Sequence, residues 1–166
     1  MEPLIITDFD GIINPMAQMP FERQFPDMVE SFFIDSDGYH VPVTYSQTVH
    51  DFYHEITQQV EVQWLTSWLH DTAVFPQYLG LPDIPWISDP WTPKDGPSVW
   101  WKLLAMKQVS VGRRVLWLDD EFHIDPDGEI QRFLAENKNI TIIHPETSKG
   151  LSPAHLQQIR DFIALG

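Results

Sequence analysis

The stretch LIITDFDG at residues 4–11 decides the fold, because an apolar run ends there in two acids and a glycine. Branched aliphatic residues in succession are typical of a strand buried on both faces, as in a parallel sheet. Asp8 and Asp10 are two residues apart, so their side chains start on the same side of the strand end. Gly11 lets the chain turn sharply behind them.

Strand-like and helix-like segments alternate along the rest of the chain, which predicts an α/β fold with a largely parallel sheet. Further strands are expected at 60–65, 84–87, 115–118 and 140–143. Residues 14–45 break the alternation, and within them two short strands at about 32–44 flank an Asp-Gly turn, which predicts a hairpin. We expect residues 1–166 to form one domain, with the segment at about 14–45 as its only insertion.

Composition limits the possible functions. The 166 residues are 43% apolar and include no cysteine, which excludes disulfides and thiolate metal sites. Acidic residues outnumber basic ones 24 to 10, for a formal charge of −14. Such a charge excludes an extended surface for duplex nucleic acid, although one nucleotide or a strand end could still bind. No apolar run is long enough for a bilayer and the N-terminus does not resemble a signal peptide, so we expect a cytoplasmic protein.

Polar side chains follow three of the expected strands. Asp8 and Asp10 follow the first, Thr66 follows the strand at 60–65, and the pair Asp119-Asp120 follows the strand at 115–118. In open parallel sheets, ligands bind beyond the carboxyl ends of the strands. Acids gathered there repel one another unless a proton or cation lies between them. Such a set of oxygens suits Mg²⁺, which shares phosphate oxygens with a substrate.

This arrangement predicts phosphoryl transfer. Asp8 would attack phosphorus and form an aspartyl-phosphate, while Asp10 would protonate the leaving oxygen and then activate a water. Thr66 would donate its hydroxyl to the phosphate, and the ammonium of Lys102 could reach the same site. Lys94 and Lys107 are alternatives for that lysine.

These motifs resemble those of the haloacid dehalogenase superfamily. Asp8-Phe9-Asp10-Gly11 is similar to its first motif, Thr66 to its second, Lys102 to its third, and Asp119-Asp120 to its fourth. Shorter stretches resemble a capless branch that also occurs in multidomain "Swiss Army knife" RNA-repair proteins: residues 10–15, 64–68, 79–82, 117–121 and 150–152. The resemblance covers nearly the whole chain.

The resemblance implies a Rossmann-like three-layer sandwich with a five-stranded parallel sheet of order 5-4-1-2-3, a β-hairpin flap and no large cap domain. It implies an Mg²⁺-dependent phosphohydrolase of phosphomonoesters, with the metal bound by Asp8, the backbone carbonyl of Asp10, and Asp119. Asp120 is a further candidate metal ligand, and Gly11 joins Thr66 and Lys102 as phosphate-binding. An open site favours a nucleotide, an oligonucleotide end or a phosphoprotein. One departure from the family motif is Ile12, which stands where a threonine is usual.

Several alternatives remain open at this point. The chain could be a catalytically idle binding or assembly module that keeps the fold. His50 and His54, four residues apart on an expected helix, could bind Zn²⁺ but are better explained as a surface pair. Tryptophans near 86–101 could contact a substrate, and exposed aromatics around an open site would suit a homodimer.

Overall fold

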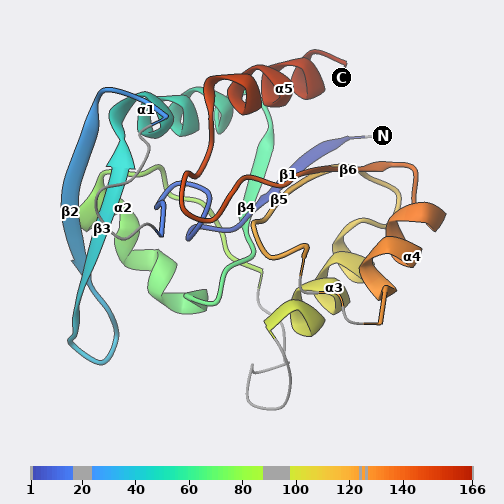
Figure 1. Cartoon of the computed structure of the whole chain (residues 1–166), viewed down its shortest axis with the longest axis horizontal. Coiled ribbons are helices and arrows are strands. Elements are labelled where there is room, and N and C mark those ends of the chain that lie inside the picture. Colours follow the sequence, from blue (N-terminus) through green and yellow to red (C-terminus); the bar gives the residue numbers. More distant parts are fainter. Residues whose placement is uncertain (1, 17–23, 88–97, 124, 126, 166) are drawn as a thin grey trace.

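A four-stranded parallel sheet of order β4-β1-β5-β6 lies at the centre of the molecule (Figure 1). The computed structural model describes residues 2–16, 24–87, 98–123, 125 and 127–165, without the side chains of 98–100. Its elements are β1 (Pro3–Thr7), β2 (Met28–Ile34), β3 (His40–Ser46), α1 (Gln47–Ile56), β4 (Glu61–Trp64), the 3₁₀ helix η1 (Leu69–Val74), α2 (Phe75–Leu79), α3 (Ser98–Val109), β5 (Arg114–Leu118), α4 (Glu129–Glu136), β6 (Ile140–Ile143) and α5 (Pro153–Ala164).

The α/β class and the parallel sheet are confirmed, but the expected strand number and order are wrong. The predicted strand at 84–87 is not part of the sheet, so β4 is an edge strand and the fifth strand expected beside it is missing. That segment forms only an isolated bridge between Trp86 and Trp64. Pro85 has no N–H to donate, and Pro82 stands just before the segment, so a continuous ladder cannot form there.

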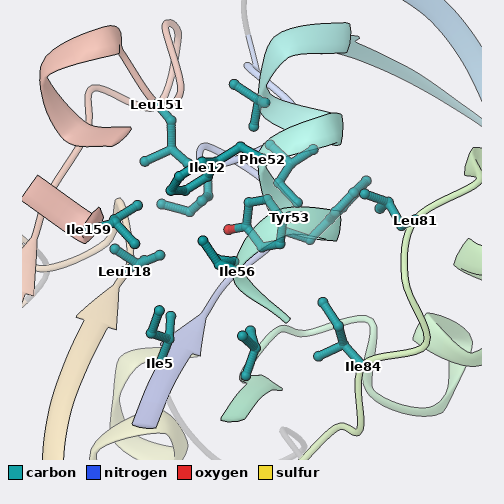
Figure 2. Close-up of a cluster of buried hydrophobic side chains, with 14 of the residues drawn as sticks. Ile5, Ile12, Phe52, Tyr53, Ile56, Leu81, Ile84, Leu118, Leu151 and Ile159 are labelled. Carbon is teal, nitrogen blue, oxygen red and sulfur yellow. The ribbon is translucent and has the colours of Figure 1, made fainter. Parts of the chain in front are cut away.

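Alternating side chains of the sheet enter two cores. On one face, Ile5 and Leu118 pack with α1 and α5; Figure 2 shows them near Tyr53 and Ile159. On the other face, residues of the sheet including Trp117 pack with α3 and α4. In Figure 1 the two pairs of helices accordingly lie on opposite sides of the sheet. Helices on both faces explain why β1 is apolar throughout its centre.

The predicted hairpin is present and formed by β2 and β3, which pair antiparallel from Met28↔Ser46 to Ile34↔His40. Its turn contains Gly38, with φ of +86°. Phe33 of β2 is fully buried and packs edge-on against Phe75 of α2, with ring centroids 5.0 Å apart. The hairpin is therefore tied to the body of the protein through its aromatic face.

Local caps define the helices that border the hairpin and end the chain. Ser46 caps α1 by accepting a hydrogen bond from the Val49 N–H, and Ser152 caps α5 in the same way from His155. Pro153 occupies the first turn of α5, where its missing N–H is not needed. Among the helices that the structure describes, none has the length and apolar character required to cross a bilayer.

Candidate functional site

Acids that follow β1 and β5 meet at the carboxyl edge of the sheet. The pairing of the two strands continues past their ends, since the Asp8 N–H donates to the Leu118 carbonyl at 2.9 Å. Asp8, Asp119 and Asp120 are buried, and each offers a carboxylate oxygen within 4.8 Å of the other two. This acid triad could bind a metal ion. Three of the four predicted metal ligands are thus brought together.

The ammonium of Lys102 reaches the same place from α3. Its Nζ lies 2.5 Å from Asp8 Oδ2 and 2.9 Å from Asp119 Oδ2, and the side chain is only 2% exposed. Of the alternatives, Lys107 is exposed on the same helix, and Lys94 lies outside the described residues. The geometry therefore favours Lys102 as the lysine of the site.

Glu121 is a member of the site that the sequence does not reveal. It is expected to be a solvated neighbour of Asp119-Asp120, but its Oε2 lies 3.1 Å from Lys102 Nζ. Its own N–H donates to Asp119 Oδ1 at 2.9 Å. The only signal in the sequence is that it is the third acid in succession after a buried strand.

The charges of the site do not balance. Burial lowers the pKa of Lys102, but the charges of Asp8, Asp119 and Glu121 outweigh burial and raise that pKa overall. Burial raises the pKa of Asp119, and Asp8 adds to this effect against the opposing influence of Lys102. One ammonium thus faces several carboxylates in a buried setting, where a second cation would be stabilised.

The donor set fits a hard divalent cation. Asp119 Oδ2 is buried, and its one polar contact among the described groups is the ion pair with Lys102 Nζ at 2.9 Å. A carboxylate oxygen has a second lone pair that can bind a metal beside the ammonium, and Mg²⁺ prefers one or two carboxylates together with waters and phosphate oxygens. The acid triad supplies such oxygens.

Asp10 does not belong to the acid triad through its side chain. Its Oδ1 accepts a hydrogen bond from Asn14 Nδ2 at 2.7 Å, and its Oδ2 accepts one from Trp68 Nε1 at 2.8 Å. Both carboxylate oxygens of Asp10 are thus engaged, which leaves its backbone carbonyl as the metal ligand that the resemblance implies. Burial raises the pKa of Asp10, against the lowering effect of the hydrogen bonds from Asn14 and Trp68.

Gly11 and Thr66 lie beside these acids in different ways. Gly11 has φ of +68°, and a Cβ placed on it would overlap the carboxylate of Asp120. Thr66 is buried where β4 ends, and its Oγ1 accepts a long hydrogen bond of 3.5 Å from the Trp68 N–H. The preceding Leu65 N–H donates to the Thr7 carbonyl, which aligns the end of β4 with that of β1.

The histidine pair and the tryptophans that the structure describes have packing or hydrogen-bonding roles within the fold. His50 Nε2 and His54 Nε2 bond the carbonyls of Leu79 and Gly80, at 3.1 and 2.8 Å, so they close the end of α2. Trp64, Trp101 and Trp117 are buried in the cores, and Trp86 is half-buried beside β4. Trp91 and the side chain of Trp100 lie outside the described part of the chain.

Comparisons of the chain with protein-family models, with curated proteins and with solved structures found no match.

Proposed function

We propose that the chain is an Mg²⁺-dependent phosphohydrolase of the haloacid dehalogenase type, which cleaves phosphomonoesters through an aspartyl-phosphate on Asp8. The observation that carries this proposal is the division of labour among the acids. Asp8 lies in the acid triad and contacts Lys102, whereas Asp10 is held apart by Asn14 and Trp68.

The acid triad would hold the metal, with the buried Asp119 Oδ2 as one ligand. A bound Mg²⁺ supplies a Lewis acid that offsets the charge of the phosphoryl oxygens, so that an anionic nucleophile can approach. Lys102 lies between Asp8 and Asp119, where its ammonium adds to that neutralisation and orients Asp8.

In the first half of the reaction, a carboxylate oxygen of Asp8 forms a bond to phosphorus while the bond from phosphorus to the leaving oxygen breaks. Asp10 gives its proton to that leaving oxygen. The raised pKa of Asp10 suits this donor role, because a carboxyl that stays protonated at higher pH can act as an acid.

In the second half, Asp10 accepts a proton from water, whose oxygen bonds to phosphorus as the phosphorus–Asp8 bond breaks. Inorganic phosphate is released and both carboxyl groups return to their first state. The two acids need different surroundings for these roles. Asp8 contacts Lys102, whereas burial raises the pKa of Asp10 and the hydrogen bonds from Asn14 and Trp68 orient its carboxyl group.

The proposal is tested with para-nitrophenyl phosphate as substrate. We expect turnover with Mg²⁺, loss of turnover on chelation, and a fall in kcat of at least about a thousandfold in Asp8→Asn. Asp83→Asn is the matched control, because Asp83 is exposed and makes no hydrogen bond with any described residue. If neither this substrate nor a panel of nucleotides, phosphorylated oligonucleotides and phosphopeptides is turned over, the fold serves binding or assembly instead.

A further inference from the structure

An open pocket of about 590 Å³ adjoins the acid triad, and the chemistry proposed above does not use it. The two share Asp120, which belongs to the acid triad and also lines the pocket. A phosphomonoester whose phosphorus lies at the acid triad could therefore extend its leaving group into this pocket. The lining of the pocket then decides which leaving groups are accepted.

Two histidines of the pocket are anchored to one backbone carbonyl. His123 Nδ1 and His144 Nε2 lie 3.1 and 3.0 Å from the carbonyl oxygen of Asp120, and the two rings are within 9° of parallel. A carbonyl oxygen only accepts, so these two nitrogens carry hydrogen. In the neutral rings the other nitrogens, His123 Nε2 and His144 Nδ1, are hydrogen-bond acceptors.

The other polar groups of the lining also favour a ligand that donates hydrogen bonds. Thr147 and Ser148 contribute hydroxyl groups, and Glu146 contributes a carboxylate. Within the described chain no lysine or arginine lines the pocket; Lys149 pairs with Glu146 from outside the lining, at 3.1 Å. A second phosphate on the ligand would meet acceptors and negative charge there, which is unfavourable.

We propose that this pocket binds the leaving group of the substrate and selects a neutral group rich in hydroxyls, that is, the sugar of a sugar monophosphate or of a ribonucleoside monophosphate. The inference rests on the proposed function. Sugar hydroxyls donate to imidazole nitrogens and carboxylates and exchange hydrogen bonds with Thr147 and Ser148. Met16, which is 54% exposed and lines the same pocket, offers an apolar surface to the C–H groups of a sugar ring.

The test compares kcat/KM with Mg²⁺ for glucose 6-phosphate, fructose 1,6-bisphosphate, adenosine 5′-monophosphate and its 2′,3′-dideoxy analogue, with para-nitrophenyl phosphate as reference. We expect kcat/KM of the hexose monophosphate to exceed that of the bisphosphate by about tenfold or more, because the second phosphate is repelled by the acceptors and negative charge of the lining. If kcat/KM is higher for adenosine 5′-monophosphate than for both its dideoxy analogue and glucose 6-phosphate, the sugar is a ribose. If kcat/KM is highest for glucose 6-phosphate, the substrate is a free sugar phosphate.

Two variants locate the selectivity in the pocket. Thr147→Val removes a hydroxyl that lines the pocket and also bonds the carboxylate of Asp120, so its effect is measured relative to para-nitrophenyl phosphate. Its matched control is Thr141→Val, at an exposed threonine of β6 outside this pocket. We expect Thr147→Val, and also His144→Phe, to raise KM for the sugar ester, so that its kcat/KM relative to para-nitrophenyl phosphate falls about tenfold. Thr141→Val should leave that ratio where it is in the unaltered protein.

The outcomes separate this inference from the function on which it rests. Turnover of para-nitrophenyl phosphate with no preference for hydroxyl-rich esters, or with a preference for the bisphosphate, overturns the pocket assignment and leaves the phosphohydrolase standing. Without turnover of any ester, the phosphohydrolase fails, and calorimetric titration with glucose 6-phosphate decides on the pocket alone. Binding that Thr147→Val weakens and Thr141→Val does not would support it; no binding would overturn it.

Discussion

The indole Nε1 of Trp68 donates a hydrogen bond to Oδ2 of Asp10 across 2.8 Å, although 58 residues separate them. The same indole packs edge-on against Phe33 of the hairpin, with centroids 4.9 Å apart. The other oxygen of Asp10 is held by Asn14, whose Oδ1 accepts from the Thr44 N–H of β3. Both strands of the hairpin are thus coupled to the orientation of one carboxyl group.

Trp68→Phe should lower kcat by about tenfold to a hundredfold, because it removes a hydrogen bond to an acid that must be aimed at the leaving oxygen. The substituted ring can still pack against Phe33, so the change in thermal stability should be small. Phe33→Leu is the complementary variant: it keeps the hydrogen bond and loses a buried ring. We expect it to cost more stability than Trp68→Phe and less kcat. Steady-state kinetics and thermal unfolding of both proteins check this, and equal effects on kcat would contradict it.

Lys102→Met should destabilise the metal-free protein by about 3–5 kcal/mol, because it leaves buried carboxylates without their cation. Mg²⁺ should recover part of that loss, since a metal ion on the acid triad replaces some of the missing positive charge. Lys107→Met on the same helix is the control; that side chain is exposed, so the free energy of unfolding should change by no more than about 0.5 kcal/mol. Denaturant unfolding with and without Mg²⁺ measures both. Equal stability of the two variants would show that Lys102 is not needed to neutralise the site.

Local patterns in the sequence predict the strand ends that carry Asp8, Asp119 and Thr66, because each follows a buried apolar run. They do not predict the contact of Trp68 with Asp10 or that of Glu121 with Lys102, since tertiary packing creates both. The expected strand at 84–87 fails for a related reason. Its apolar residues satisfy the pattern for a strand, but Pro85 lacks the N–H that a ladder needs.

Asp27 should make a pH-dependent contribution to stability. It accepts hydrogen bonds from the Thr48 N–H at 2.8 Å and from Ser46 Oγ at 2.7 Å, where the hairpin meets α1. Burial alone would raise the pKa of Asp27, but the hydrogen bonds from Thr48 and Ser46 outweigh it and lower the pKa. A lowered folded-state pKa gives stability that is complete above the unfolded pKa and is lost as pH falls through the folded one.

Asp27→Asn should therefore cost about 1 kcal/mol at neutral pH, as for the loss of a helix cap. The difference from the unaltered protein should shrink as the pH is lowered below about 4, where the aspartate becomes protonated. Urea unfolding as a function of pH measures this, with Asp83→Asn as an exposed control. A difference that stays constant down to the lowest pH would mean that the charge of Asp27 does not contribute.

Gly11→Ala separates backbone strain from steric conflict at the site. Gly11 has φ of +68°, and an added Cβ would overlap the carboxylate of Asp120, so the acid would have to move.

Gly112 is the matched control: its φ is +70°, and nothing lies within 4 Å of an added Cβ. Gly112→Ala should show only the strain of a left-handed alanine, about 1 kcal/mol. Gly11→Ala should show that strain and also weaken the stabilisation by Mg²⁺, because Asp120 is a member of the acid triad. Thermal unfolding of both variants over a series of Mg²⁺ concentrations measures the two effects, and the same Mg²⁺ response in both would rule out Asp120 as a ligand.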